Sequence, residues 1–267
     1  MALRGKTALI TGSSRGIGRG IAVKLAQQGV KVAVHYYSQE DGAKDTLAKV
    51  RAAGSDGFAM QADVTKPDDI RKLFDRVEKE FGKLDILVCN ARPELAAFYR
   101  APMDCGVEHL RSALDSQAQA FLLSAQMGAR IMPDGGRMIA ISYTPGGRTG
   151  SWQPWIAMGA AKAALDALAR YFAVALGKRG ITVNIISPGA TSDSVVGRLP
   201  TEVFSAIKKW HEGGWTPMGR VGTPADIGNA VMLLCLEEAG FITGQTIHVD
   251  GGGSIMDSVF PLEIQQG

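Results

Sequence analysis

The amino-acid sequence predicts an α/β fold, in which one doubly wound domain of residues 1–267 has helices on both faces of a seven-stranded parallel sheet. Two observations predict this fold. Short β-branched runs alternate with helix-length amphipathic stretches from one end of the chain to the other, as in successive βαβ units. No internal repeat, low-complexity tract or linker marks a second domain, and a hydrophobic content of 46% is enough for one buried core.

The first half of the chain is expected to supply three strand–helix pairs. Residues 7–11 form an apolar run that leads directly into a glycine-rich segment, and residues 16–29 continue with apolar positions at helical spacing. The next two pairs are strand 31–36 with helix 39–53, and strand 58–63 with helix 67–81.

The second half repeats this order with longer helices. The expected strands are 84–90, 137–142, 182–188 and 246–250, and the expected helices include 112–132 and 154–177. Parallel strands end at the same edge of a sheet, and ligands of such folds bind at the carboxyl ends of the strands. Candidate functional residues are therefore those that directly follow each strand.

Composition excludes several classes of function. The net charge is only +3, and the basic residues are dispersed among acidic ones, which argues against a nucleic-acid partner. The chain enters an apolar strand at once and has no run as long as a membrane span, so we expect no membrane association and a cytoplasmic location. Three cysteines without histidines at ligand spacing indicate a reducing compartment and no metal site.

The segment TGSSRGIGRG, at residues 11–20, predicts a nucleotide site because it follows the first strand and opens the first helix. Gly12 permits a tight turn, Gly16 lets backbone approach a phosphate, and Gly18 allows close packing of helix and strand. The loop residues expected to contact a cofactor are Gly12, Ser14, Arg15, Gly16, Ile17 and Gly18.

This glycine spelling resembles that of the short-chain dehydrogenase/reductase family, and the resemblance covers nearly the whole chain. Its other motifs are ADV at 62–64, CNA at 89–91, Ser142 at a strand end, Lys162 on the following helix, SPG at 187–189 and GQTIHVDGG at 244–252. The resemblance implies a Rossmann-type fold, a nicotinamide dinucleotide and a homotetramer. It also implies cofactor contacts from Asp63, Val64, Asn90, Ala91, Pro188, Gly189 and Thr191, with Lys162 on the nicotinamide ribose.

The end of the second strand bears on which dinucleotide binds. An NAD-dependent enzyme places a carboxylate there to accept from the ribose 2′-hydroxyl, whereas this chain reads VAVHYYSQED, with Tyr37 near that point. Arg15 in the glycine loop can reach a 2′-phosphate, so NADPH is preferred over NADH. The alternative is that Arg15 only solvates the loop and that Glu40 or Asp41 takes the ribose.

The family's usual catalytic tyrosine is missing. It stands four residues before the lysine, where this chain has Met158, although Ser142 and Lys162 are in place. Enoyl-thioester reductases of the family instead carry Y-x-x-M-G-x-x-K, with a tyrosine seven residues before the lysine. The segment WIAMGAAK, residues 155–162, resembles that pattern with Trp155 in place of the tyrosine, and ISYT at 141–144 resembles the same branch through Tyr143.

The missing phenol favours one of two reactions. A ketone becomes an alkoxide that must take a proton, whereas hydride addition to an α,β-unsaturated thioester gives an enolate whose oxygen needs only a hydrogen bond. Indole N–H is such a donor, so Trp155 suits the second reaction. The alternatives are that Trp155 fills space and that Tyr143 or a cofactor hydroxyl serves the oxygen; Met158 is interpreted as pocket lining.

The resemblance implies that the segment of about 191–218 covers the substrate. Its apolar residues Phe204, Trp210 and Trp215 suit an acyl chain or ring, carried on CoA or an acyl carrier protein, better than a sugar. We therefore expect an NADPH-dependent enoyl-thioester reductase. A carbonyl reductase of the same family and a catalytically silent cofactor-binding protein remain as alternatives.

Overall fold

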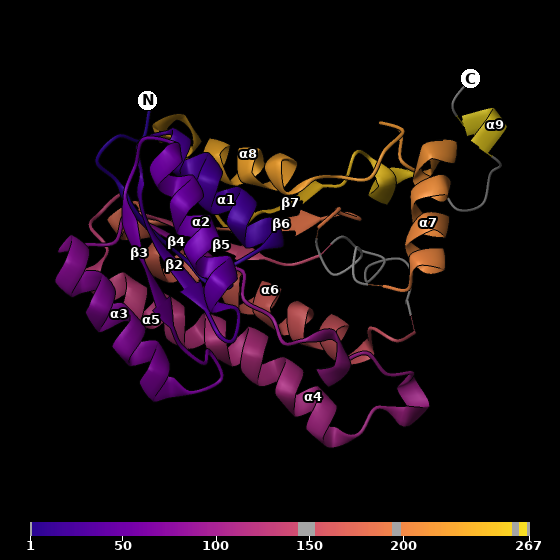
Figure 1. The fold of residues 1–267 in the computed structure, drawn as a ribbon, viewed down its shortest axis with the longest axis horizontal. Coiled ribbons are helices and arrows are strands. Elements are labelled where there is room, and N and C mark those ends of the chain that lie inside the picture. Colours follow the sequence, from indigo (N-terminus) through magenta and orange to yellow (C-terminus); the bar gives the residue numbers. More distant parts are fainter. Residues whose placement is uncertain (1, 144–152, 194–198, 258–261, 266–267) are drawn as a thin grey trace.

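Seven parallel strands form one sheet with the order β3-β2-β1-β4-β5-β6-β7 (Figure 1). The computed structural model describes residues 2–143, 153–193, 199–257 and 262–265. The strands are β1 (Thr7–Ile10), β2 (Lys31–Tyr36), β3 (Gly57–Gln61), β4 (Ile86–Cys89), β5 (Arg137–Ile141), β6 (Thr182–Pro188) and β7 (Thr246–Val249). The predicted seven-stranded parallel sheet is thus confirmed.

The strand order reverses between β1 and β4, and this reversal positions the site. The chain moves outward from β1 through β2 to β3, then crosses to β4 on the other side of β1. Leu9 accordingly pairs with Ala33 of β2 and with Leu87 of β4. The loops that leave β1 and β4 depart in opposite directions, which opens a crevice at the carboxyl edge.

Helices cover both faces of the sheet (Figure 1). One face carries α1 (Gly16–Gln27), α2 (Glu40–Ala52) and α8 (Pro224–Cys235), and the other carries α3 (Pro67–Phe81), α5 (Ala120–Ile131) and α6 (Ile156–Leu176). Three more helices lie outside these layers, α4 (Val107–Leu114), α7 (Thr201–Trp210) and α9 (Leu262–Gln265). Short 3₁₀ turns occur at Leu95–Ala97, Pro102–Asp104, Gly177–Arg179, Glu237–Ala239 and Gly253–Ile255, and π turns at Asp115–Gln119 and His211–Trp215.

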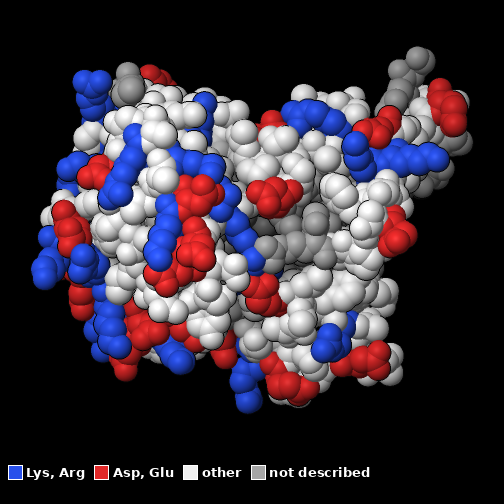
Figure 2. All heavy atoms as spheres, in the orientation of Figure 1, with Lys and Arg blue, Asp and Glu red and all other residues white. Residues whose placement is uncertain are grey.

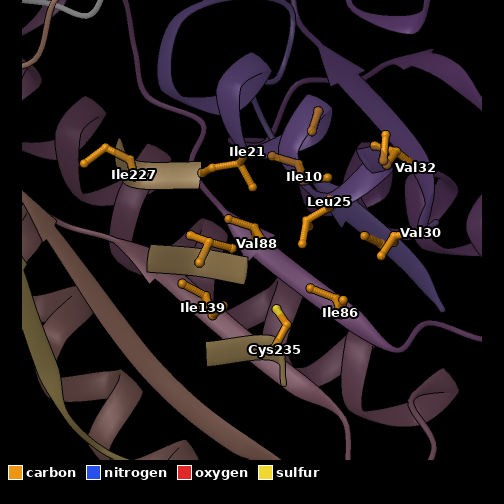
Figure 3. Close-up of a cluster of buried hydrophobic side chains, with 14 of the residues drawn as sticks. Ile10, Ile21, Leu25, Val30, Val32, Ile86, Val88, Ile139, Ile227 and Cys235 are labelled. Atoms are coloured by element: carbon orange, nitrogen blue, oxygen red, sulfur yellow. The ribbon is translucent and has the colours of Figure 1, made fainter. Parts of the chain in front are cut away.

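Each face of the sheet has its own apolar core. In Figure 3, Ile21 and Leu25 of α1 and Ile227 of α8 pack over strand residues such as Val88. These side chains are fully buried. Burying a side chain of this size contributes about 1.5–3 kcal/mol, so the contact of α1 and α8 with the sheet firmly anchors the helix that follows the glycine loop.

The largest difference from the expected elements lies before α5. The sequence predicts one helix over 112–132, whereas the structure has α4, a π turn and then α5, so the helical region starts at Val107. The predicted start at residue 112 is thus five residues late, although Val107, Leu110 and Leu114 have helical spacing. The helices α7 and α8 were not among the expected elements either. Pro224 and the Thr223 cap mark the start of α8.

On the face of the molecule in Figure 2, the Lys and Arg side chains do not form a continuous basic stripe. Figure 2 shows Lys and Arg intermingled with Asp and Glu across it. Several of these residues form ion pairs one helical turn apart, such as Lys44 with Glu40 and Arg76 with Glu80. Across the described ranges, no helix combines the length and hydrophobicity that a bilayer span requires.

Candidate active site

A pocket of about 560 Å³ lies at the carboxyl edge of the sheet, where the strand order reverses. It brings together most of the residues that the sequence nominated. From the cofactor set it is lined by Gly12, Ser14, Arg15, Gly16, Ile17, Gly18, Tyr37, Asp63, Val64, Asn90, Ala91, Pro188 and Gly189. From the catalytic and substrate sets it is lined by Ser142, Tyr143, Trp155, Met158 and Lys162.

The glycine loop has no room for larger side chains. Gly12 has a φ of +65°, and a Cβ there would meet the Ala91 Cα at 2.8 Å. A Cβ on Gly18 would come within 2.4 Å of the Gly12 carbonyl oxygen and 2.6 Å of the Asn90 amide nitrogen. This close packing holds the N-terminus of α1 at the pocket, and no acidic residue stands in its first turn. Such an N-terminus fits the pyrophosphate of a dinucleotide.

Two polar side chains hold the loop at the strand ends. The Asn90 amide donates to the carbonyl oxygens of Thr11 and Gly12, both at 2.9 Å. The Thr11 hydroxyl accepts from the backbone N–H groups of Asn90 and Ala91 at 2.9 and 3.0 Å. Asn90 therefore ties β4 to the glycine loop, and Thr11, which the sequence did not nominate, does the same from β1.

His35 is a loop-holding residue that sequence reasoning missed. Its Nδ1 accepts a hydrogen bond from the Gly12 N–H at 2.8 Å, and its Nε2 bonds the Ala62 carbonyl oxygen at 3.1 Å. These partners require the neutral ring with its proton on Nε2. Burial lowers the pKa of His35 to about 4, so the imidazole ring is neutral at neutral pH. In the sequence, this role of His35 is indicated only by a polar residue inside the otherwise apolar run of β2.

The basic residue of the loop has an acidic partner. The Arg15 guanidinium forms an ion pair with Glu94 at 2.9 Å, and both side chains line the pocket. The two residues stand on opposite walls, after β1 and after β4. Tyr37 is 62% exposed at the far end of the same pocket. Arg15 therefore faces the cofactor groove, but with a carboxylate already on it.

Lys162 lies buried at the other end of the pocket. It is 7% exposed, and its ammonium donates to the Ile141 carbonyl oxygen at the end of β5. Burial lowers the pKa of Lys162 to about 8, against the opposing effect of the Asp166 carboxylate. Met158, one turn earlier on α6, is 3% exposed and places a thioether where the family has a phenol.

Tyr143 and Trp155 contact each other across the pocket wall. The strand β5 ends at Ile141, so the chain is no longer regular where Tyr143 enters the pocket, as its expected role required. The Tyr143 and Trp155 ring centroids lie 6.4 Å apart. The indole also meets Phe98 edge-on at 5.0 Å and Tyr99 at 6.1 Å. Phe98 is fully buried and lines the pocket, although no sequence pattern indicated it.

Four nominated residues lie outside this pocket lining. Thr191 is 1% exposed, and its hydroxyl donates to the Gly189 carbonyl oxygen at 2.9 Å, so it closes a turn; Asp193 reaches the pocket instead. Phe204, Trp210 and Trp215 do not line the pocket either.

These three aromatic residues thus lie outside the pocket lining, and their role in covering the substrate stays a prediction. Trp210 and Trp215 stack on one another with centroids 4.8 Å apart, which partly satisfies their apolar surface away from the pocket. Phe204 and Trp210 belong to α7, and Trp215 ends the π turn that follows it. The helix α7 lies outside the two helical layers of the sheet (Figure 1). Residues 194–198 of the expected covering segment lie outside the described part of the chain.

Comparison with known proteins gives three kinds of similarity. A family model described as enoyl-(acyl carrier protein) reductase matches residues 12–254. The chain is 37% identical to 1-cyclohexenylcarbonyl-CoA reductase of Streptomyces collinus, over 96% of this chain and 90% of that protein. It is 33% identical to a tetrahydroxynaphthalene reductase of Pestalotiopsis fici, over 93% and 91% of the two chains. An angucycline C-6 ketoreductase solved with bound NADP superposes with a TM-score of 0.86 at 35% identity, covering 96% of this chain and 98% of its own.

Proposed function

The chain belongs to the short-chain dehydrogenase/reductase family, whose members are oxidoreductases, and from this premise we propose that it reduces the C=C bond of an α,β-unsaturated acyl thioester with NADPH. The observation that carries the proposal is Met158. The family's proton-donating phenol is replaced by a buried thioether that is 3% exposed. The pocket thus lacks the acid that ketone reduction uses at this position, while the residues that fit a dinucleotide are present.

The proposed reaction depends more on a hydrogen bond to the thioester oxygen than on a proton-donating acid. When bound, NADPH supplies the hydride that adds to the β-carbon of the substrate. The thioester oxygen then carries the enolate charge, which a hydrogen-bond donor must stabilise. Ser142, Tyr143 and Trp155 line the pocket end where such a donor is required, and Lys162, which lines the same pocket, would hold the nicotinamide ribose.

The cofactor choice rests on the other end of the pocket. No carboxylate stands at the end of β2, where Tyr36 and Tyr37 follow His35. Arg15 lines the pocket and can bind a 2′-phosphate through its guanidinium N–H donors, provided that the phosphate displaces Glu94. We therefore propose NADPH rather than NADH.

Aromatic side chains favour a ring-bearing acyl group. Phe98, Tyr143 and Trp155 line the pocket beside Met158, and flat rings pack well against such walls. The Streptomyces relative is named for a cyclohexenyl thioester, which agrees with this preference.

Ketone reduction is the second candidate. The Pestalotiopsis relative and the angucycline neighbour are named as a hydroxynaphthalene reductase and a ketoreductase. Tyr143 supplies a phenol to the same pocket from the strand side, so a hydroxyl donor is not absent altogether.

A substrate panel separates these functions. The rate of NADPH oxidation is measured with cyclic and linear enoyl-CoA thioesters and with aromatic polyketide-type ketones. The proposal expects the highest kcat/KM with a cyclic enoyl thioester. A ketone turned over faster than every enoyl thioester would overturn it in favour of the second candidate. NADPH binding with no turnover on either class would indicate a silent cofactor-binding protein.

A further inference from the structure

The phenol of Tyr143 rests against a single glycine of the catalytic helix. A Cβ built on Gly159 would lie 2.9 Å from the Tyr143 hydroxyl oxygen, closer than real Cβ contacts occur. Leaving aside the two residues adjacent to Gly159 in the sequence and the backbone of its own helix, no other heavy atom of the described residues comes within 4 Å of that position. Gly159 follows Met158 directly, so the phenol oxygen meets α6 one residue from the position of the missing tyrosine.

The Trp155 indole is the second contact of the Tyr143 phenol on this helix. Trp155 and Gly159 are four residues apart, so they share one face of the helix at adjacent turns. The Tyr143 ring meets the Trp155 ring at 6.4 Å and an interplanar angle of 65°. The phenol is thus bounded by an indole on one side and by bare helix backbone on the other. Its neighbour Ser142, together with Met158 and Lys162, lines the same pocket.

We propose that Tyr143 is the catalytic hydroxyl of this protein, donated to the substrate oxygen from the end of β5, and that Gly159 and Trp155 are the positioning residues that seat it. The inference rests on the proposed function in taking that oxygen to be the thioester oxygen. It assigns to the strand a role that the family gives to the helix, and it gives Gly159 a reason to lack a side chain.

The chemical step balances without a further reagent. Hydride from NADPH adds to the β-carbon, and the C=C electron pair moves to the bond between the α-carbon and the carbonyl carbon. The carbonyl π pair moves onto oxygen, where the Tyr143 O–H donates a hydrogen bond and keeps its proton. A proton from solvent water then adds to the α-carbon as the carbonyl reforms, and the hydroxide left over is neutralised in the bulk solvent. The saturated thioester and NADP⁺ remain.

The protonation of Tyr143 agrees with this role. Burial raises the pKa of the Tyr143 phenol, and the Asp166 carboxylate raises it further. The hydroxyl therefore keeps its proton through neutral pH and acts as a donor. Trp155 is held by edge-on contacts with Phe98 and Tyr99 as well, which suits a wall that fixes a neighbouring ring.

Gly159→Ala is the selective test, because the added methyl must displace the phenol and meets nothing else in the described residues. We expect Tyr143→Phe and Gly159→Ala each to lower kcat on the order of 10²-fold and to raise KM by no more than about tenfold, as for loss of one preorganised donor. The double variant should lose no more than Tyr143→Phe alone. Trp155→Phe, which keeps a ring in place, should lower kcat by less than about tenfold, while Trp155→Ala should approach the loss of Tyr143→Phe.

Gly177→Ala is the matched control. Gly177 ends the same helix with right-handed backbone, and a Cβ there would meet nothing within 4 Å. It should retain wild-type kcat. Alanine favours helix in both variants, so neither should melt below the wild type, which excludes misfolding as the cause of a lost rate. Wild-type kcat in Gly159→Ala or in Tyr143→Phe would overturn the inference, as would additive losses in the double variant.

The wild-type panel decides the proposed function separately. If the wild type reduces a ketone instead of an enoyl thioester, the same variants measured with that ketone still decide whether Tyr143 serves the oxygen. Binding adds a readout without turnover, with calorimetry of a saturated acyl-CoA added to protein and NADP⁺. Tyr143→Phe and Gly159→Ala should both weaken this binding about three- to tenfold, the worth of one net hydrogen bond. Unchanged affinity in both, with unchanged rates, contradicts the assignment.

Discussion

At the scale of single residues, one substitution reorganises the catalytic end of this pocket. Met158 takes the place of a phenol one turn before Lys162, and burial lowers the pKa of that lysine to about 8. A lysine beside a tyrosine would shift the phenol's pKa, whereas here burial raises the pKa of the Tyr143 phenol. We therefore propose that Lys162 holds the cofactor and that Tyr143 forms the hydrogen bond to the substrate.

Lys162→Ala tests the cofactor-holding half of this division. We expect at least a 10²-fold lower kcat/KM, since the ribose anchor and the local positive charge are lost together. Met158→Leu, which nearly conserves volume, should leave kcat within a few-fold. Because the ammonium loses its proton as pH rises through about 8, wild-type NADPH affinity should weaken above that pH. Flat NADPH affinity from pH 7 to 9 would contradict the role.

His35 gives the fold a defined sensitivity to acid. Its folded-state pKa of about 4 lies below the ordinary 6.5, so between these pH values the unfolded chain binds a proton that the folded chain does not. The free energy of unfolding should therefore fall as pH falls from 6.5 to 4, by up to about 3 kcal/mol. In His35→Asn, whose side-chain oxygen can still accept from Gly12, denaturant titrations should show a shallower fall. An identical pH slope would refute the assignment.

At the scale of elements, the carboxyl edge of the sheet collects its residues from segments far apart in the sequence. The glycine loop after β1 and the loop after β4 face each other through Arg15 and Glu94, which form an ion pair across the groove. The N-terminus of α1 supplies backbone donors below them. We propose that cofactor selection depends on both loops, of which the first carries the glycine motif and the second begins within the CNA motif at 89–91.

Cofactor binding by Arg15 variants tests that arrangement. Arg15→Ala should weaken NADPH on the order of tenfold or more and NADH much less, because only NADPH carries the 2′-phosphate. Glu94→Gln removes the competing carboxylate and should strengthen NADPH binding a few-fold. Fluorescence titration of both cofactors measures the two effects. Equal losses for NADPH and NADH in Arg15→Ala would show that the arginine only supports the loop.

At the scale of the whole molecule, the helices α4 and α6 pack together and leave apolar side chains facing solvent. Tyr171 and Val174 of α6 are 77% and 84% exposed, and Val107 of α4 is 69% exposed. Largely exposed apolar residues of this kind on neighbouring helices suit an interface with a second copy of the chain.

We therefore predict a homotetramer that uses this surface. Light scattering at micromolar concentration should give four times the chain mass, and Tyr171→Asp combined with Val174→Asp should lower it. Lys178→Glu, at the exposed end of the same helical region, is a charge-changing control that should leave the mass unchanged. A monomeric wild type would contradict the prediction.

The local features of the sequence determined the strands, the glycine loop and the missing tyrosine. Alternating apolar runs specify seven strands, and the unusual pairing of Lys162 with Met158 needs no coordinates to be seen. Such features depend on residues a few positions apart, where backbone geometry alone relates pattern to structure.

Tertiary structure alone decided which side chains meet. His35 reaches Gly12, Glu94 reaches Arg15, and the Tyr143 phenol reaches Gly159, each through a contact between segments that the chain separates. Trp210 and Trp215, which the resemblance to the family put in the substrate-covering segment, stack on each other in this structure. The reason is that an apolar side chain can be satisfied by any apolar neighbour, so sequence shows that it will be covered, and only the packing of the whole chain selects by what.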